Sequence, residues 1–547
     1  MAPFGEGQWA LGYREPLNKS ERIKRDDDGL NVRDRILNVY SKEGFSSIWP
    51  DDLRGRMRWW GLYTQRRQGI GGGMTARCEP HELEDEFFMM RIRIAGGQMN
   101  SDQLRTIADI SERYGRGVAD ITDRQNVQLH WIRIEDVPAI WEMLDGIGLT
   151  TCEACGDCPR NMLGCPVAGA DAHELFDATP DLMRVSRRFL GDPDFSNLPR
   201  KFKTSITACS QHCAQHETQD IAFVGVEHEG KLGYDLWVGG GLGPNPHFGQ
   251  RLGVFVERDQ IVDAWAAAAG VFRDYGFRRA RNRARVKFLM KAWGAEKYRK
   301  VMQDEYLGYQ LPDGPEPSPS NHAQRDHVGV YDQTDGKKYV GLAPKAGRTS
   351  SVQLRRVADL ADEYAQGRIR ATTQQKLVIL DVEPSGTEAL VTELDKLDMP
   401  ANPSQFRRAT MACTGIEFCK LAIVETKQRA DWLYRELEDR LPDFDEPVRI
   451  NINGCPNSCA RFQIADIGFM GSMMSKPDGT KYDGFQVQLG GHLGENYKFG
   501  RKVKGLKVPA HQLADYTEKL LKTYLSTKAD EEQFYQWAER APDAWLK

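Results

Sequence analysis

The alternation of apolar and polar residues predicts a half-buried β-strand between residues 87 and 97. The apolar residues at positions 88, 90, 92 and 94 share one face of an extended chain, and Arg91 lies on the other. Side chains of a strand alternate between two faces, so this spacing is typical of a strand with one face in the core. Arg91 is therefore expected to point away from that core.

A helical period follows this strand. Leu104, Ile107 and Ile110 recur at the spacing of one helix face, and Gly115 marks the expected end. Ser101 stands directly before the first apolar residues and is the expected N-cap, because its hydroxyl can accept a hydrogen bond from a free backbone N–H.

Two more strands and a second helix complete this first unit. They are expected at residues 118–123, 126–134 and 138–147. In the second of these strands, simple alternation places Val127, Leu129 and Trp131 on one face and Ile132 on the other.

The same order of elements returns in the second half of the chain. The segment QLR at 103–105 reappears 250 residues later at 353–355, and ITDRQNVQL resembles ATTQQKLVI. Cys209-x3-Cys213 followed by QDIAFVG reappears as Cys455-x3-Cys459 followed by ADIGFMG. These matches indicate an internal duplication, because chance rarely preserves order and spacing together.

The duplication predicts an α+β fold with a pseudo-twofold arrangement. Each half contributes a small βαβ-containing unit, at 82–150 and 335–400, and a larger α/β unit, at 151–334 and 401–547. A Pro- and Ser-rich segment at 311–322 joins the halves. Residues 1–81 are expected to wrap the rest of the chain or dock a partner, although a surface extension without function fits their polar sequence equally well.

Composition narrows the class of protein. The 547 residues have a net charge of −4, which gives no reason to expect nucleic acid as a partner. No apolar run is long enough to span a membrane, and the first residues lack the layout of a signal peptide. The eleven cysteines cannot all pair, so a reducing cytoplasm is the expected location.

Four cysteines carry the strongest chemical signal. Cys413 and Cys419 are spaced C-x5-C, and Cys455 and Cys459 are spaced C-x3-C. Glycine and proline flank Cys455, which predicts that the second pair lies on a turn. Four thiolates can hold an iron–sulfur cluster. A structural zinc site usually has closer pairs, and two pairs of reduced buried thiols are the remaining alternative.

These motifs also carry a resemblance to a known family. CTGIEFCKLA at 413–422, followed by NGCPNSC at 453–459, resembles the cluster signature of the siroheme-dependent sulfite and nitrite reductases. The resemblance extends from about residue 87 to the C-terminus. It implies two ferredoxin-like half-units, a [4Fe–4S] cluster on the four cysteines, and siroheme whose iron shares the Cys459 thiolate.

The resemblance implies a cationic site for siroheme carboxylates and an anionic substrate. The expected substrate-binding residues are Arg91, Arg160, Lys201 and Lys203, the two lysines being placed on one side of a strand. Arg124 is expected to bind a siroheme carboxylate, with Gln125 and Asn126 as weaker candidates. Taken singly, each cation would more often be solvated or paired in a salt bridge.

The implied enzyme reduces sulfite to sulfide, or nitrite to ammonia, with six electrons. Because no flavin or nicotinamide module is evident, ferredoxin is the implied electron donor, and a monomer is expected. Lys203 favours sulfite, since sulfite reductases of this family tend to have K-x-K where nitrite reductases have K-x-N. An iron–sulfur sensor or passive electron carrier is the alternative from another class.

Three further cysteines need an interpretation. Cys209 and Cys213 are interpreted as remnants of the duplication, because two further ligands at suitable spacing are not evident. Cys155 lies five residues before Arg160, and Tyr63 could reach the same pocket. The hypothesis for this pair is a Tyr63–Cys155 thioether formed by oxidation at the site.

Overall fold

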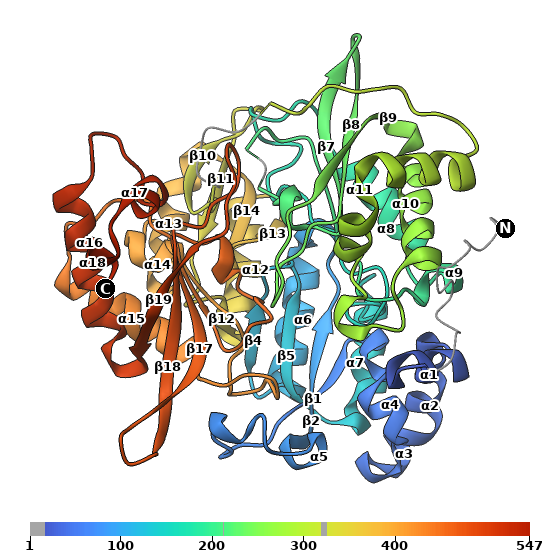
Figure 1. The fold of residues 1–547 in the computed structure, drawn as a ribbon, viewed down its shortest axis with the longest axis horizontal. Helices are drawn as coiled ribbons and strands as arrows, with labels where there is room; N and C mark the ends of the chain where they lie inside the picture. Colours follow the sequence, from blue (N-terminus) through green and yellow to red (C-terminus); the bar gives the residue numbers. More distant parts are fainter. Residues whose placement is uncertain (1–16, 212, 319–324) are drawn as a thin grey trace.

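The computed structural model describes residues 17–211, 213–318 and 325–547, and the described strands form four sheets (Figure 1). Two ferredoxin-like sheets lie in the middle, with the first α/β unit (green) on one side and the second (orange to red) on the other. The expected α+β class is confirmed. None of the helices in these ranges is long and apolar enough to cross a membrane.

The two ferredoxin-like units exchange a strand. The first sheet has the order β1-β2-β5-β4-β12, and the second has the order β10-β11-β14-β13-β3, so β12 and β3 each lie in the sheet of the other half. The first-half elements are β1 (Leu62–Arg66), β2 (Glu84–Ile92), β3 (Gln98–Asn100), α6 (Ser101–Tyr114), β4 (Val118–Ile121), β5 (Val127–Ile132) and α7 (Val137–Asp145). Those of the second half are β10 (Gly329–Asp332), β11 (Lys338–Leu342), β12 (Arg348–Ser350), α12 (Ser351–Tyr364), β13 (Arg368–Ala371), β14 (Leu377–Val382) and α13 (Thr387–Lys396).

Matched salt bridges support the pseudo-twofold arrangement. On α6, Arg105 pairs with Asp359 at 3.0 Å and with Asp362 at 2.8 Å on α12. In return, Arg355 on α12 pairs with Asp109 on α6 at 2.7 Å. The arginines are 250 residues apart, as in the sequence repeat, and one apolar core extends through both units.

Each larger unit contains one mixed sheet with helices packed beside it. The first consists of α8 (Thr179–Phe189), α9 (Pro193–Ser196), β6 (Thr204–Thr207), β7 (Ile221–His228), β8 (Lys231–Val238), β9 (Gln250–Glu257), α10 (Ile261–Tyr275) and α11 (Val286–Val301). The second consists of α14 (Gln405–Ala409), β15 (Thr410–Ala412), α15 (Lys427–Arg440), β16 (Ile450–Asn453), β17 (Ile467–Ser475), β18 (Lys481–Leu489), β19 (Arg501–Pro509), α16 (Leu513–Thr527), α17 (Phe534–Arg540) and α18 (Asp543–Leu546). In both sheets the first pairings are parallel and the later ones antiparallel.

Local predictions for the first unit hold with three corrections. The strand predicted at 87–97 is β2, which ends at Ile92 and buries Phe88, Met90 and Ile92, and the helix predicted to end near Gly115 is α6. Its N-cap is Asn100 rather than Ser101, because the Asn100 side chain accepts the Gln103 N–H. Trp131 has φ +64°, which breaks the alternation of β5 and turns Ile132 into the core with Leu129.

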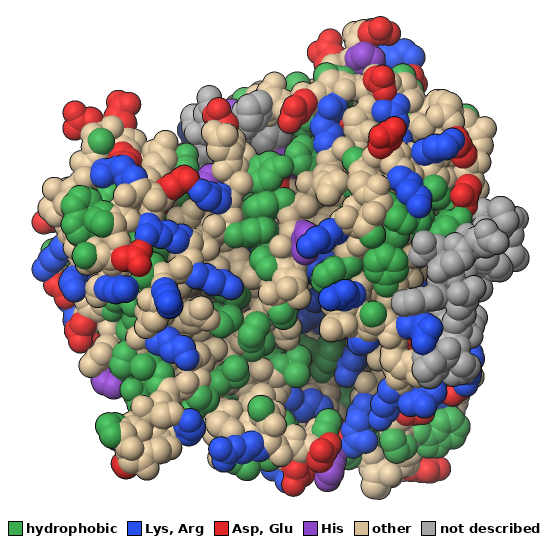
Figure 2. All heavy atoms as spheres, in the orientation of Figure 1, with side chains coloured by type: hydrophobic (Ala, Val, Ile, Leu, Met, Phe, Trp, Pro, Cys, Tyr) green, Lys and Arg blue, Asp and Glu red, His purple; other side chains and the backbone are tan. Residues whose placement is uncertain are grey.

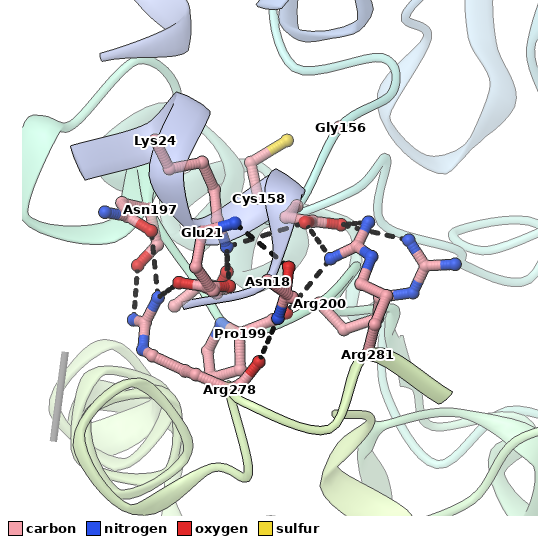
Figure 3. Close-up of polar contacts among 12 residues, drawn as sticks. Asn18, Glu21, Lys24, Gly156, Cys158, Asn197, Pro199, Arg200, Arg278 and Arg281 are labelled. Atoms are coloured by element: carbon pink, nitrogen blue, oxygen red, sulfur yellow. Dashed lines mark hydrogen bonds and ion pairs between the residues drawn. The ribbon is translucent and has the colours of Figure 1, made fainter. Parts of the chain in front are cut away.

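The part of the N-terminal segment described here is folded against the first α/β unit. It contains α1 (Lys19–Asp26), α2 (Val32–Arg35), α3 (Ser41–Glu43), α4 (Pro50–Arg54) and α5 (Pro80–Leu83), while β1 joins the first sheet. From α1, buried Lys24 donates to Leu198 O at 2.8 Å, and Glu21 pairs with Arg278 at 3.2 Å (Figure 3). Residues 1–16 and residues 319–322 of the expected linker lie outside the described ranges.

Asp157 joins three cations of this contact. It pairs with Lys24 at 3.5 Å, with Arg200 at 3.4 Å and with Arg281. Burial alone would raise the pKa of Asp157, but these three cations outweigh burial and hold its pKa far below the ordinary value. The ion pair between Lys24 and Asp157 therefore holds helix α1 against the loop that contains Cys155 and Arg160.

Candidate active site

The four motif cysteines come from two loops at one edge of the second α/β sheet. Strands β15 and β16 are parallel, with Ala412 opposite Ile452, so both chains leave the sheet on the same side. Cys413 directly follows β15, and Cys455 follows β16 by one residue. The carboxyl ends of neighbouring parallel strands are a common place for a ligand site. The prediction that Cys455 and Cys459 lie on a turn is confirmed.

Glycine lets the first cysteine loop fold back on itself, and the second loop contacts it. Gly415 has φ +70°, and a Cβ there would lie 2.3 Å from Thr426 Oγ1. Thr426 in turn donates to the carbonyl of Cys413 at 2.6 Å. Gly454 N–H donates to Cys413 Sγ at 3.2 Å, a contact that favours negative charge on the sulfur.

The four sulfurs are close enough to influence one another. Burial and the neighbouring Cys459 sulfur raise the pKa of Cys413 to about 12, and the same two causes raise the pKa values of Cys419 and Cys455. Thiolates held this way repel one another unless a cationic centre lies between them. The donor set fits a cluster of iron ions, and Cys459 is the most exposed of the four.

Arg91 and Arg160 meet at Cys155. Arg91 projects from β2 and donates to Cys155 Sγ at 3.3 Å and to Gln128 Oε1 at 2.9 Å, leaving its buried Nε without a partner. Arg160 donates to the same sulfur at 2.7 Å and to Gly156 O at 2.8 Å. Burial, then Arg160, lowers the pKa of Arg91 to about 10, while the Cys459 sulfur opposes the shift.

Lys201 and Lys203 lie before strand β6 rather than within a strand. The prediction of a longer strand was wrong, because only Phe202 between them pairs with Pro159, in an isolated parallel bridge. This bridge still leaves the lysines one residue to either side and beside Arg160, whose N–H donates to Phe202 O at 2.8 Å.

The ammonium groups of Lys201 and Lys203 lack partners among the described residues. Neither forms a hydrogen bond or ion pair with any residue in the described ranges. Burial, then Arg285 and Arg160, lowers the pKa of Lys201 to about 8, and the Cys459 sulfur opposes this shift. Burial, then Arg124 and Lys201, lowers the pKa of Lys203 well below its ordinary value.

In the Arg124–Gln125–Asn126 turn, the first and third side chains keep unused donors, whereas the second binds backbone groups. Arg124 donates to Gln219 Oε1 at 3.1 Å and to Asn161 O, but its buried Nε has no partner. Gln125 instead uses its amide on backbone groups, including Ala371 O at 2.9 Å. Asn126 accepts from Ile94 N at 3.2 Å, and its amide nitrogen bonds to no residue that the structure describes.

Two cations of this region were missed from the sequence. Arg461 follows Cys459 by two residues, and its buried Nε and Nη1 have no hydrogen-bond partner. Arg58 lies 5.8 Å from the centre of the Tyr63 ring, and the charge of Cys155 acts on its pKa, so it is near both. The position of Arg461 directly after the cysteine motif was a usable signal, whereas Arg58 had none.

Tyr63 faces the site from the next strand. Its partner across β1 and β2 is Met89, two residues before Arg91, so Tyr63 and Arg91 project from the same face. The ring of Tyr63 and the sulfur of Cys155 therefore approach the cationic region from different elements.

The cationic groups suit an anionic cofactor. Buried guanidinium N–H groups without partners are rare in folded proteins and indicate a missing acceptor. In this region such groups belong to Arg91, Arg124 and Arg461, and the Nε groups of Arg54, Arg93, Arg325 and Arg368 also lack a hydrogen-bond partner. Figure 2 shows Lys and Arg side chains gathered around a hollow near the middle of the drawn face. A polycarboxylate beside the cysteine loops would supply the acceptors.

Comparison with known proteins identifies the family. The family model described as "Nitrite and sulphite reductase 4Fe-4S domain" matches residues 155–311 and 404–545, and the one described as "Nitrite/Sulfite reductase ferredoxin-like half domain" matches 81–147 and 331–397. The chain belongs to the nitrite and sulfite reductase family. Its cofactors are a [4Fe–4S] cluster and siroheme, as the cysteine motif led us to expect.

Whole-chain relatives agree with this assignment. A protein of Mycolicibacterium paratuberculosis named sulfite reductase [ferredoxin] 1 is 52% identical, over 99% of this chain and 98% of its own. The solved structure of the Mycobacterium tuberculosis NirA protein matches with a TM-score of 0.96 and 50% identity, over 99% of this chain and all of that one. An assimilatory ferredoxin-dependent nitrite reductase of Haloferax mediterranei is 36% identical, over 96% of this chain and 92% of its own.

Proposed function

We propose that this nitrite and sulfite reductase family member is an assimilatory enzyme that reduces sulfite to sulfide with six electrons from reduced ferredoxin. The observation that carries the proposal is the pair of unpaired ammonium groups of Lys201 and Lys203. Lys201 lies within electrostatic reach of Arg160 and Cys459, and Lys203 within reach of Arg124. The substrate, an anion with up to two charges, supplies the partner that these groups lack.

In this proposal Arg91 and Arg160 bind the anion, and Lys201 supplies protons. Both guanidinium groups are held by Cys155, so Arg91 and Arg160 would bind the anion without having to reorganise. Arginine keeps its proton, whereas Lys201, with a pKa of about 8, can release one near neutral pH. Lys201 is therefore the proposed immediate proton donor as oxygen leaves as water.

The same geometry assigns residues to the cofactors. Arg124, Arg461 and Asn126 have unused donors for siroheme carboxylates, while Gln125 acts through the backbone that positions them. Cys413, Cys419, Cys455 and Cys459 are the proposed cluster ligands, with Cys459 shared by the siroheme iron. When bound, the two cofactors supply the one-electron steps.

Electron supply and location complete the proposal. The relatives named sulfite reductase [ferredoxin] support ferredoxin as the donor, since electrons must come from a separate protein. All eleven cysteines are free of disulfides, which fits the reducing cytoplasm. A monomer remains our expectation.

Nitrite reduction to ammonia is the second candidate. The relative from Haloferax mediterranei supports it by name, but at lower identity than the sulfite reductases. The pair of lysines favours sulfite, because the second ammonium adds a contact for a second negative charge.

Steady-state turnover tests the proposal directly. The holoenzyme, supplied with reduced ferredoxin, should release sulfide from sulfite with a higher kcat/KM than it releases ammonia from nitrite. A protein with both cofactors present, by absorption spectrum and acid-labile sulfide, that forms no sulfide would refute the assignment.

A further inference from the structure

The first half of the chain has its own counterpart of the cluster site. In the second half, Gln375 bonds both backbone groups of Ala412, at 2.9 and 3.2 Å, directly before Cys413. In the first half, Gln125 bonds both backbone groups of Gly164, at 3.2 and 3.0 Å. The next residue is Cys165, which therefore occupies the position of Cys413.

The remaining ligand positions follow the same correspondence. Cys209 and Cys213 come after β6 as Cys455 and Cys459 come after β16. Asp171 lies six residues after Cys165, as Cys419 lies six residues after Cys413. The pair was interpreted from sequence as a remnant without further ligands. The structure overturns that reason, because Cys165 and His327 lie beside Cys213.

These side chains are gathered tightly in the interior. Ligand atoms of Cys165, Asp171 and Cys209 all lie within 4.8 Å of one another, as do those of Cys165, Cys213 and His327. All five residues are buried. A zinc ion with Zn–S bonds of about 2.3 Å spaces its tetrahedral sulfurs about 3.8 Å apart, whereas a four-iron cluster holds them much farther apart. The spacing within each triad suits one ion, and Cys165 belongs to both triads.

His327 provides independent evidence of a missing ligand. Its side chain is buried, yet neither Nδ1 nor Nε2 has a hydrogen-bond partner in the structure as described. A buried imidazole without any partner is unfavourable, because both nitrogens lose their bonds to water.

Asp171 is already occupied by other partners. Its carboxylate pairs with Arg325 and with His173 Nδ1, the latter at 2.9 Å. It also accepts from Cys209 Sγ at 3.6 Å. Asp171 is therefore placed to support the site from outside, and Arg325 offsets the negative charge that three thiolates and one divalent ion would leave.

We infer that Cys165, Cys209, Cys213 and His327 bind one zinc ion, at the pseudosymmetric counterpart of the [4Fe–4S] site. Three thiolates and one imidazole form a closed tetrahedral set typical of structural zinc, with no position left for a substrate. The ion would join the segment between the halves, through His327, to the first α/β unit. Residues of the second ferredoxin-like sheet, such as Tyr339 and Val378, pack around it.

Metal analysis of the holoenzyme tests the inference. After growth with added zinc and purification through a chelator, the enzyme should contain about one zinc per chain in addition to its iron. X-ray absorption at the zinc edge, which iron does not disturb, should show three sulfurs at about 2.3 Å and one nitrogen at about 2.0 Å. Less than about a tenth of a zinc per chain, or a shell of oxygen and nitrogen alone, would overturn the site.

Variants locate the ion. Cys165→Ser and His327→Asn should lose zinc while keeping acid-labile sulfide, and Cys459→Ser should lose iron while keeping zinc. Cys152→Ser, at a buried cysteine outside the cluster, is the matched control and should keep both metals. Zinc retained in full by both Cys165→Ser and His327→Asn contradicts the assignment. If those variants fail to fold, the zinc-edge X-ray absorption spectrum of the unaltered enzyme decides whether three sulfurs and one nitrogen bind the ion.

Discussion

At the scale of single residues, the site is distinguished by lysines that have no partner. The buried lysines Lys24, Lys287 and Lys427 each donate to a backbone carbonyl, as Lys24 does to Leu198. Lys201 and Lys203 have no such bond among the described residues. Both lysine side chains are half-buried in the site, so an anion bound there would supply the acceptor that their ammonium groups lack.

Lys203 should govern the choice of substrate. Replacing it by asparagine, in Lys203→Asn, removes one ammonium from the anion site and should lower kcat/KM for sulfite by about 10- to 100-fold, or about 1.4–2.7 kcal/mol. The loss for nitrite should be smaller, since nitrite has a single charge. Lys203→Arg, which keeps the charge, is the control. Equal losses for both anions, or a wild type that prefers nitrite, would show that charge does not select the substrate.

Lys201 should set the alkaline limit of activity. Its pKa is about 8, so the ammonium is lost as pH rises through this value, and kcat/KM for sulfite should fall above about pH 8. Lys201→Arg keeps its charge at high pH and should move this limit upward, at a lower maximal rate because arginine does not donate its proton. An unchanged alkaline limit in Lys201→Arg would exclude Lys201 as the titrating group.

A thioether crosslink between Tyr63 and Cys155 remains a prediction. Cys155 Sγ is held by two guanidinium groups, and Arg58 lies near both the sulfur and the Tyr63 ring. A thioether would join the two tryptic peptides into one species that is lighter than their sum by two hydrogen atoms, which mass spectrometry measures. Two separate unmodified peptides from active enzyme would rule the crosslink out.

At the scale of elements, periodicity predicted regular segments and failed where the backbone departs from them. β2 and α6 follow from alternation and helical spacing, because nothing interrupts either pattern. Trp131 takes a left-handed conformation that no pattern of apolar residues encodes. The cysteine loops were predictable because their ligands are local, whereas Arg58 reaches the site through tertiary packing alone.

The cysteines of the first half and those of the second half should form two independent metal sites. Cys459→Ser should lose both siroheme and cluster absorption, because one sulfur is proposed to serve both. Cys209→Ser should keep full iron and acid-labile sulfide, since its sulfur belongs to the other site. Iron and sulfide assays on the two purified variants make the comparison. Iron loss in Cys209→Ser would mean that the first-half cysteines support the cluster after all.

At the scale of the whole molecule, the duplication was visible in sequence but the exchange of strands was not. Matched blocks 250 residues apart predict two similar halves. The exchanged strands β3 and β12 are only three residues long, too short for any periodic signal. The helix pair α6 and α12 shows the consequence, since each arginine of the repeat finds its acids on the opposite half.

Gln125 and Gln375 occupy matching positions in the two halves, and replacing each by alanine should have a different effect. Gln375→Ala frees both backbone groups of Ala412 before Cys413, so the variant should lose iron during purification. Gln125→Ala frees the matching groups of Gly164, and also Ala371 O on the second half, so it should lower the apparent Tm while keeping iron. Each buried group left without a partner costs about 1–3 kcal/mol.

Comparing the two variants tests whether the halves divide their work. Iron content and heat inactivation of the loaded enzyme are the measurements, because a protein with two cofactors does not unfold in one step. Equal iron loss in both variants would mean that the junction transmits any disturbance to the cluster. Iron loss confined to Gln375→Ala would mean that the second half alone secures the cluster, while the Gln125 side of the same pseudo-twofold contact holds the halves together.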